Sequence, residues 1–223
     1  MPLLEVCASN LESARAAAEG GAERIELCRD LDKDGLTPSD EDISAAKSLS
    51  QIKVFVLIRS REGNFIYDSD ELSMMEEQII RARELGADGI VIGALTPEGE
   101  VDMPACRRLI KAAWNLPVTF HRAFDQASDP FRALEDIISL GCTRLLTSGQ
   151  ANTALEGCEL ISKLVQQAQG RIIIMPGAGV NPGNAKEILH RTGCTEIHSS
   201  ARKSSNQKHT DPATVAAILD QIL

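Results

Sequence analysis

Two strand-like segments near the start of the chain each carry a glutamate followed two residues later by a cysteine. Glu5 and Cys7 stand in LLEVC, and Glu26 and Cys28 stand in RIELC. Residues two apart lie on one face of a strand, so each glutamate shares a face with its cysteine. Paired thiolates are soft ligands that suit Cu(I), and carboxylates at the same place suit acid–base chemistry.

Three further segments add charged or titratable residues to this set. Arg59 follows an apolar segment, His121 and Asp125 stand in FHRAFD, and His198 stands in EIHSS. We expect Arg59 to be the counter-charge of the two glutamates, and Asp125 to orient His121. Each residue taken alone also has a structural interpretation. A glutamate paired with the arginine would be a barrel staple, and His121 would be a hydrogen-bonded core residue.

The segment MPGAGVNPGN has the composition of an anion-binding loop, because glycines let backbone N–H groups converge on an oxyanion. Small polar residues also follow the predicted strands 144–147 and 196–199, on either side of the strand before this loop, and open on the same side. The alternative is a glycine-rich turn that only closes the fold. The anion or phosphate site expected here comprises Ser148, Gly149, Gly177, Gly179 and Ser200.

A repeated pattern of glycine, a small residue and then an apolar run shows which elements position these residues. It occurs in GGAERIEL, LGADGIVI, LGCTRLLT and TGCTEIHS. The glycines Gly21, Gly86, Gly141 and Gly193 are 65, 55 and 52 residues apart. One strand with its helix takes roughly 25–30 residues, so each interval holds two such units. Strands are predicted at residues 3–7, 24–28, 54–58, 89–92, 118–121, 144–147, 172–175 and 196–199.

Eight regular units predict an α/β fold: a closed (β/α)₈ barrel of the TIM type, forming a single domain over residues 1–223. The alternative, an open doubly wound sheet, would need a switch point in strand order, and the sequence indicates none. In the barrel, the inward faces place Glu5, Glu26, Arg59, His121 and His198 in the upper lumen together with the two cysteines. We expect the two Glu-x-Cys motifs to lie at the same level on adjacent strands.

The predicted helices begin at capping residues. Ser9 or Asn10 precedes a helix over 11–19, and apolar residues at 3–4 spacing predict another over 70–85. A cap followed by proline, beginning at Asp129, Asn181 and Asp211, predicts helices over 131–140, 183–191 and 213–222.

Composition narrows the functional class. The 223-residue chain carries a net charge of −9, which argues against nucleic-acid and anionic-membrane binding. No apolar run approaches the roughly 18–20 residues of a membrane span, and the N-terminus lacks a signal-like region, so we expect a cytoplasmic protein with reduced thiols. With aromatics at 3%, the core must be aliphatic. The remaining cysteines are expected to be packing residues: Cys106, Cys142, Cys158 and Cys194.

Beyond the two Glu-x-Cys strands, the segments GLTPS, LIRSREGNFIY, TFHRAFD, LLTSG, MPGAGV and IHSSAR together resemble the CutC copper homeostasis family in the same order. The resemblance runs from the first predicted strand to about Arg202. It implies a TIM barrel, a cytoplasmic homodimer or higher homo-oligomer, and a role in copper tolerance, with Cu(I) held by Cys7 and Cys28. The loop over 202–212 departs from the family pattern because it is shorter than the loop usual there.

Two functions therefore compete. The resemblance favours a copper-handling protein with Cys7 and Cys28 as Cu(I) ligands. The lumen chemistry favours an enzyme acting on a small anionic or phosphorylated substrate, with copper binding incidental. In that enzyme a lumen glutamate and His121 would be acid and base, and Arg59 would orient an anionic group. The residues assign no particular reaction.

Overall fold

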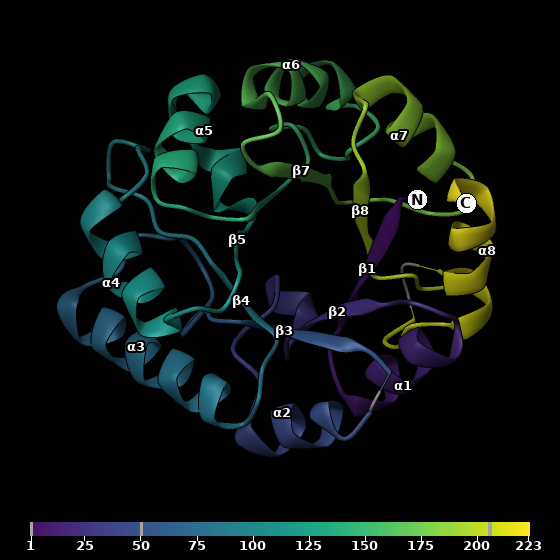
Figure 1. Cartoon of the computed structure of the whole chain (residues 1–223), viewed down its shortest axis with the longest axis horizontal. Coiled ribbons are helices and arrows are strands. Elements are labelled where there is room, and N and C mark those ends of the chain that lie inside the picture. Colours follow the sequence, from purple (N-terminus) through teal and green to yellow (C-terminus); the bar gives the residue numbers. More distant parts are fainter. Residues whose placement is uncertain (1, 50, 205–206) are drawn as a thin grey trace.

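In the described residues, 2–49, 51–204 and 207–223, eight parallel strands form a ring surrounded by eight α-helices (Figure 1). The structure is a computed structural model. The strands are β1 (Leu3–Ala8), β2 (Arg24–Leu27), β3 (Lys53–Leu57), β4 (Gly89–Ile92), β5 (Val118–Phe120), β6 (Arg144–Thr147), β7 (Ile173–Pro176) and β8 (Glu196–Ser199). The helices are α1 (Leu11–Glu19), α2 (Asp40–Lys47), α3 (Ser69–Glu84), α4 (Met103–Ala113), α5 (Pro130–Ser139), α6 (Cys158–Ala168), α7 (Ala185–Thr192) and α8 (Pro212–Ile222).

Each strand lies beside its neighbour in the sequence. The hydrogen-bonded order is β7-β6-β5-β4-β3-β2-β1-β8, and β7 and β8 then lie side by side and complete the ring (Figure 1). Strand order does not reverse anywhere in the described sheet, so the predicted (β/α)₈ barrel is confirmed and the doubly wound alternative is wrong.

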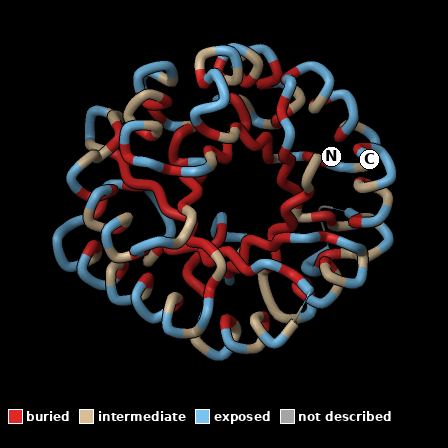
Figure 2. Tube along the Cα trace, in the orientation of Figure 1, coloured by how far each residue is buried: buried red, intermediate tan, exposed pale blue. Residues whose placement is uncertain are grey.

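Alternation along the strands separates two apolar regions. Outward residues such as Leu4 and Ile25 pack with the inner faces of the helices in one aliphatic core, and the buried ring in Figure 2 traces it. A smaller inward cluster contains Cys7, Cys28, Phe55, Leu57 and Val91. The predicted inward face of β1 and β2 is therefore the observed one.

Helix starts were predicted best where aspartate precedes proline. Asp129 and Asp211 both accept hydrogen bonds from backbone N–H groups of the first turn, as predicted. The cap predicted at Asn181 is wrong. Its side chain accepts from the Gly183 N–H (2.9 Å) and closes a turn, so α7 begins at Ala185.

None of the described helices is both long enough and apolar enough to cross a bilayer.

Candidate functional site

A cavity of about 610 Å³ opens at the carboxyl ends of the strands. This is the face where TIM barrels build their active sites, and the volume is that of a small-molecule site. The lining brings together six of the residues predicted from the sequence: Cys7, Glu26, Arg59, His121, Asp125 and His198. Glu5 lies beneath them and is fully buried.

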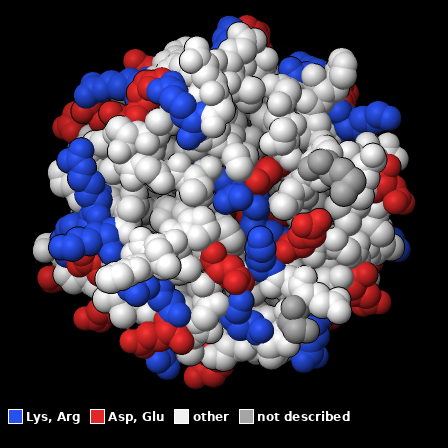
Figure 3. Space-filling model, viewed as in Figure 1, with Lys and Arg blue, Asp and Glu red and all other residues white. Residues whose placement is uncertain are grey.

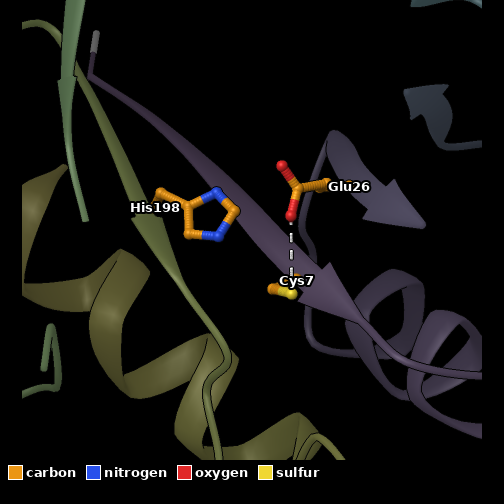
Figure 4. A group of neighbouring side chains, drawn as sticks. All are labelled: Cys7, Glu26 and His198. Atoms are coloured by element: carbon orange, nitrogen blue, oxygen red, sulfur yellow. Dashed lines mark hydrogen bonds between the residues drawn. The ribbon is translucent and has the colours of Figure 1, made fainter. Parts of the chain in front are cut away.

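A cluster of three possible metal ligands stands at the bottom of this cavity. Cys7 on β1, Glu26 on β2 and His198 on β8 point toward one another (Figure 4), and their ligand atoms all lie within 4.8 Å. The Cys7 Sγ is 3.7 Å from Glu26 Oε1 and 3.8 Å from Cys28 Sγ. Cys28 therefore extends the cluster by a second sulfur atom that the cavity itself does not reach.

The register of β1 and β2 differs from the expectation that both Glu-x-Cys motifs lie at one level. Cys7 is paired with Glu26, and Glu5 is paired with Arg24, so the second motif is shifted by two residues toward the carboxyl end. Neighbouring strands of a closed barrel must be staggered, and this stagger is the physical reason.

Arg24, which sequence reasoning missed, is the counter-charge at the base of the lumen. It donates from Nε to Glu5 and from Nη2 to Glu196, and all three side chains are buried. The His198 Nδ1 lies 2.8 Å from the other oxygen of Glu5. The signal was available, because Arg24 stands two residues before Glu26 on the same strand face.

Arg59 does not pair with the glutamates, contrary to expectation. Its guanidinium donates to the backbone oxygens of Lys33 (2.7 Å), Gly35 (3.0 Å) and Gly63 (2.9 Å). The arginine thus ties the loop after β2 to the loop after β3. The two loops bring their carbonyl groups within hydrogen-bond distance of the Arg59 guanidinium. Glu5 does not need Arg59 as a counter-charge, because it already forms an ion pair with Arg24.

Burial and these contacts shift the pKa values of the lumen groups in opposite directions. Burial alone would raise the pKa of Glu5, but the hydrogen bond with His198 and the charge of Arg24 outweigh it and lower the pKa to about 2. Burial raises the pKa of Glu26. The hydrogen bond with Cys28, together with burial, raises the pKa of the Cys7 thiol.

His121 is not oriented by Asp125, and this expectation is also corrected. Its Nδ1 accepts from the Ala123 N–H (3.1 Å). Burial, followed by the charge of Arg59, lowers the pKa of His121 to about 3, so the ring is neutral near pH 7. Asp125 instead accepts from Thr147 Oγ1 and from the Ser148 N–H (3.0 Å), which anchors the loop after β6.

The five residues predicted for an anion site divide into two groups. Gly179 and Ser200 line the cavity. The Gly177 N–H donates to the Thr147 oxygen (2.9 Å), and the Gly149 N–H donates to Thr147 Oγ1 (2.8 Å), so neither amide is free for an anion. The Ser148 hydroxyl bonds Asp125 and the Ala151 oxygen. These three residues therefore hold the structure together: Gly177 continues the ladder between β6 and β7, and Ser148 and Gly149 fix the loop after β6.

Comparison with known proteins links this architecture to one family. A family model described as the CutC family matches residues 2–203. A CutC family protein from Histophilus somni is 48% identical over 214 residues, which cover 95% of this chain and 88% of the relative. The human copper homeostasis protein cutC homolog is 48% identical over 202 residues, covering 91% of this chain and 74% of the human protein. The crystal structure of CutC from Streptococcus agalactiae superimposes with a TM-score of 0.86 at 39% identity, covering 90% and 99% of the two chains.

Proposed function

Because the chain belongs to the CutC family, we propose that it handles copper by binding Cu(I) between Cys7 and Cys28. One observation carries the proposal: the two sulfur atoms lie 3.8 Å apart. This separation is less than twice a metal–thiolate bond of about 2.3 Å, so one ion can contact both atoms without backbone movement. The human relative is named a copper homeostasis protein, which supports the choice of metal.

The chemistry of the surrounding groups suits a soft monovalent ion. Thiolates select Cu(I) over the hard cations that oxygen ligands prefer. His198 can serve as a third ligand within the cluster once its ring has lost a proton, because hydrogen bonds with Cys7 and Glu5 outweigh burial and raise the pKa of the imidazole. Both thiols are buried, so bound copper would be shielded from water. The reduced state that this requires fits a cytoplasmic protein, which we also propose.

Access to the site is through the cavity, where Cys7 forms part of the lining. The raised pKa of Cys7 keeps its thiol protonated near neutral pH, so binding displaces that proton. The apparent Cu(I) affinity is therefore expected to rise about tenfold per pH unit for each proton released. Competition titrations at two pH values against a chelator of known affinity measure this slope.

The decisive experiment is an anaerobic competition titration with a chromophoric Cu(I) chelator. We expect one tightly bound Cu(I) per wild-type chain. Loss of a group that only supports a metal ligand already weakens binding by about 10–100-fold. The double variant Cys7→Ser with Cys28→Ser removes both sulfur ligands, so we expect a loss of more than about 100-fold.

The matched control is Cys142→Ser with Cys194→Ser, which removes two other buried thiols that do not line the cavity. This control should bind Cu(I) as the wild type does. Circular dichroism establishes that both double variants are folded. Unchanged affinity in a folded Cys7/Cys28 variant would refute the copper proposal.

A further inference from the structure

The loop between β7 and α7 lines the cavity and carries two backbone N–H groups without a hydrogen-bond acceptor among the described residues. The oxygen of Ala178 accepts from the Ala154 N–H (2.9 Å), and that of Gly179 accepts from side-chain amides of Asn181 and Asn184 (3.0 and 2.9 Å). In a trans peptide the N–H points opposite to the C=O, so the N–H groups of Gly179 and Val180 point away from these anchors. None of the hydrogen bonds of the described chain uses either N–H group.

Two consecutive residues of this loop have a left-handed backbone conformation. Ala178 and Gly179 have φ values of 81° and 72°. A left-handed conformation is strained for alanine, and such strain persists only where the surroundings enforce it.

Two residues after β8 stand beside this loop. Ser200 and Arg202 both line the cavity together with Ala178, Gly179 and Val180. The side chain of Arg202 is partly buried, and the ion pairs of the described residues leave it without a carboxylate partner. A residue with a hydroxyl and a residue with a guanidinium thus line the same cavity as the loop that carries the two N–H groups.

The opposite wall carries a buried charge that also lacks a carboxylate. Arg59 is only 3% exposed, its Nε has no hydrogen-bond partner among the described residues, and its other donors bond backbone oxygens. An unpaired buried cation is costly unless an anion approaches it. The carboxylates that line the same cavity do not form an ion pair with Arg59. Asp125 pairs with Arg122, Asp34 is exposed and Glu26 contacts Cys7.

We propose that this cavity binds a small organic phosphate, whose phosphoryl group is held by the Gly179 and Val180 N–H groups with Ser200 and Arg202, and whose remainder extends toward Arg59. Charge-assisted hydrogen bonds from N–H groups and arginine are the strong contacts for a phosphate. The cavity of about 610 Å³ exceeds what inorganic phosphate needs, so the ligand carries an organic part. The proposal is independent of copper, because none of these groups belongs to the thiol pair.

The test measures binding of two probes, inorganic phosphate and ribose 5-phosphate, by isothermal titration and by the shift in melting temperature. We expect both probes to bind the wild type, and ribose 5-phosphate to bind more tightly. Arg202→Gln and Ser200→Ala are expected to weaken binding, the former by about tenfold or more because a charged hydrogen bond is lost. Arg132→Gln, an exposed arginine on α5, is the matched control and should bind as the wild type does.

Failure of this proposal is distinguishable from failure of the copper proposal. The Cys7→Ser/Cys28→Ser variant should still bind ribose 5-phosphate, because the protein groups proposed to bind the phosphate lie on other loops. The proposal would be overturned if neither inorganic phosphate nor ribose 5-phosphate binds to the wild type. Binding that survives unchanged in both Arg202→Gln and Ser200→Ala would overturn it as well, since the anion would then lie elsewhere.

Discussion

Arg24→Met is expected to lower the free energy of unfolding at pH 7 by about 3–5 kcal/mol. The variant leaves the fully buried carboxylate of Glu5 with His198 as its remaining charged partner. Glu196 keeps Arg144, whose Nε lies 2.7 Å away, so the loss concentrates on Glu5. Figure 3, which looks at the face where β1 and β3 begin, shows side chains of both charges gathered over the middle of the ring. Urea denaturation measures the change.

The matched control is Arg171→Met, which removes an exposed arginine paired with Glu135. Exposed pairs contribute about 0–1 kcal/mol, so this variant should unfold nearly as the wild type does. Arg24→Lys, which keeps the charge but loses the forked geometry, should fall between the two. Equal stability of Arg24→Met and Arg171→Met would show that the buried network does not hold the lumen together.

Acid denaturation tests the same network without removing the arginine. The pKa of Glu5 is about 2 in the folded protein and near 4.5 when exposed. The difference contributes about 3 kcal/mol above pH 4.5, and this contribution is lost as the pH falls from 4.5 toward 2. Glu5→Gln should therefore lose stability less steeply than the wild type over this range. Parallel acid limbs in the two proteins would contradict the assigned role.

The barrel was predictable because local rules determine it. The repeat of glycine, small residue and apolar run indicated where strands begin, and period-two alternation indicated that Cys7 and Glu26 point inward. These features depend on neighbours in sequence. The register of β1 against β2 depends on the stagger of the whole ring, which no single segment encodes, and so the level of Cys28 was misplaced.

The partners of charged side chains were predicted least well. Arg59 was assigned to the glutamates because alternation after Leu57 places it inward, yet backbone carbonyl groups of the loops accept the hydrogen bonds of its guanidinium. Asp125 was assigned to His121 by proximity in the sequence, yet it bonds the loop after β6. In both cases the hydrogen-bond partner of the side chain depends on how two loops pack against each other in the folded protein. Arg24 is different: the sequence analysis missed it, although alternation alone would have placed it inward with Glu26.

Gly89→Ala is the second substitution with a large expected effect, about 3 kcal/mol of destabilisation. A Cβ at Gly89 on β4 would lie 2.5 Å from Cε2 and Cζ of the Phe55 ring. The ring cannot easily move, because the guanidinium carbons of Arg24 and Arg144 lie 5.2 and 5.4 Å from its centroid. The glycine is thus required by the close approach of the Phe55 ring from the paired position on the neighbouring strand β3.

A double-mutant cycle separates this steric cause from a general weakening of β4. Phe55→Leu shortens the side chain that meets the new Cβ, so Gly89→Ala should cost much less in the Phe55→Leu background than alone. The coupling should exceed about 1 kcal/mol, while uncoupled sites add to within about 0.5 kcal/mol. Additive effects within that limit would mean that the Phe55 ring can move away from the added methyl group, and that the two arginines do not hold the ring in place.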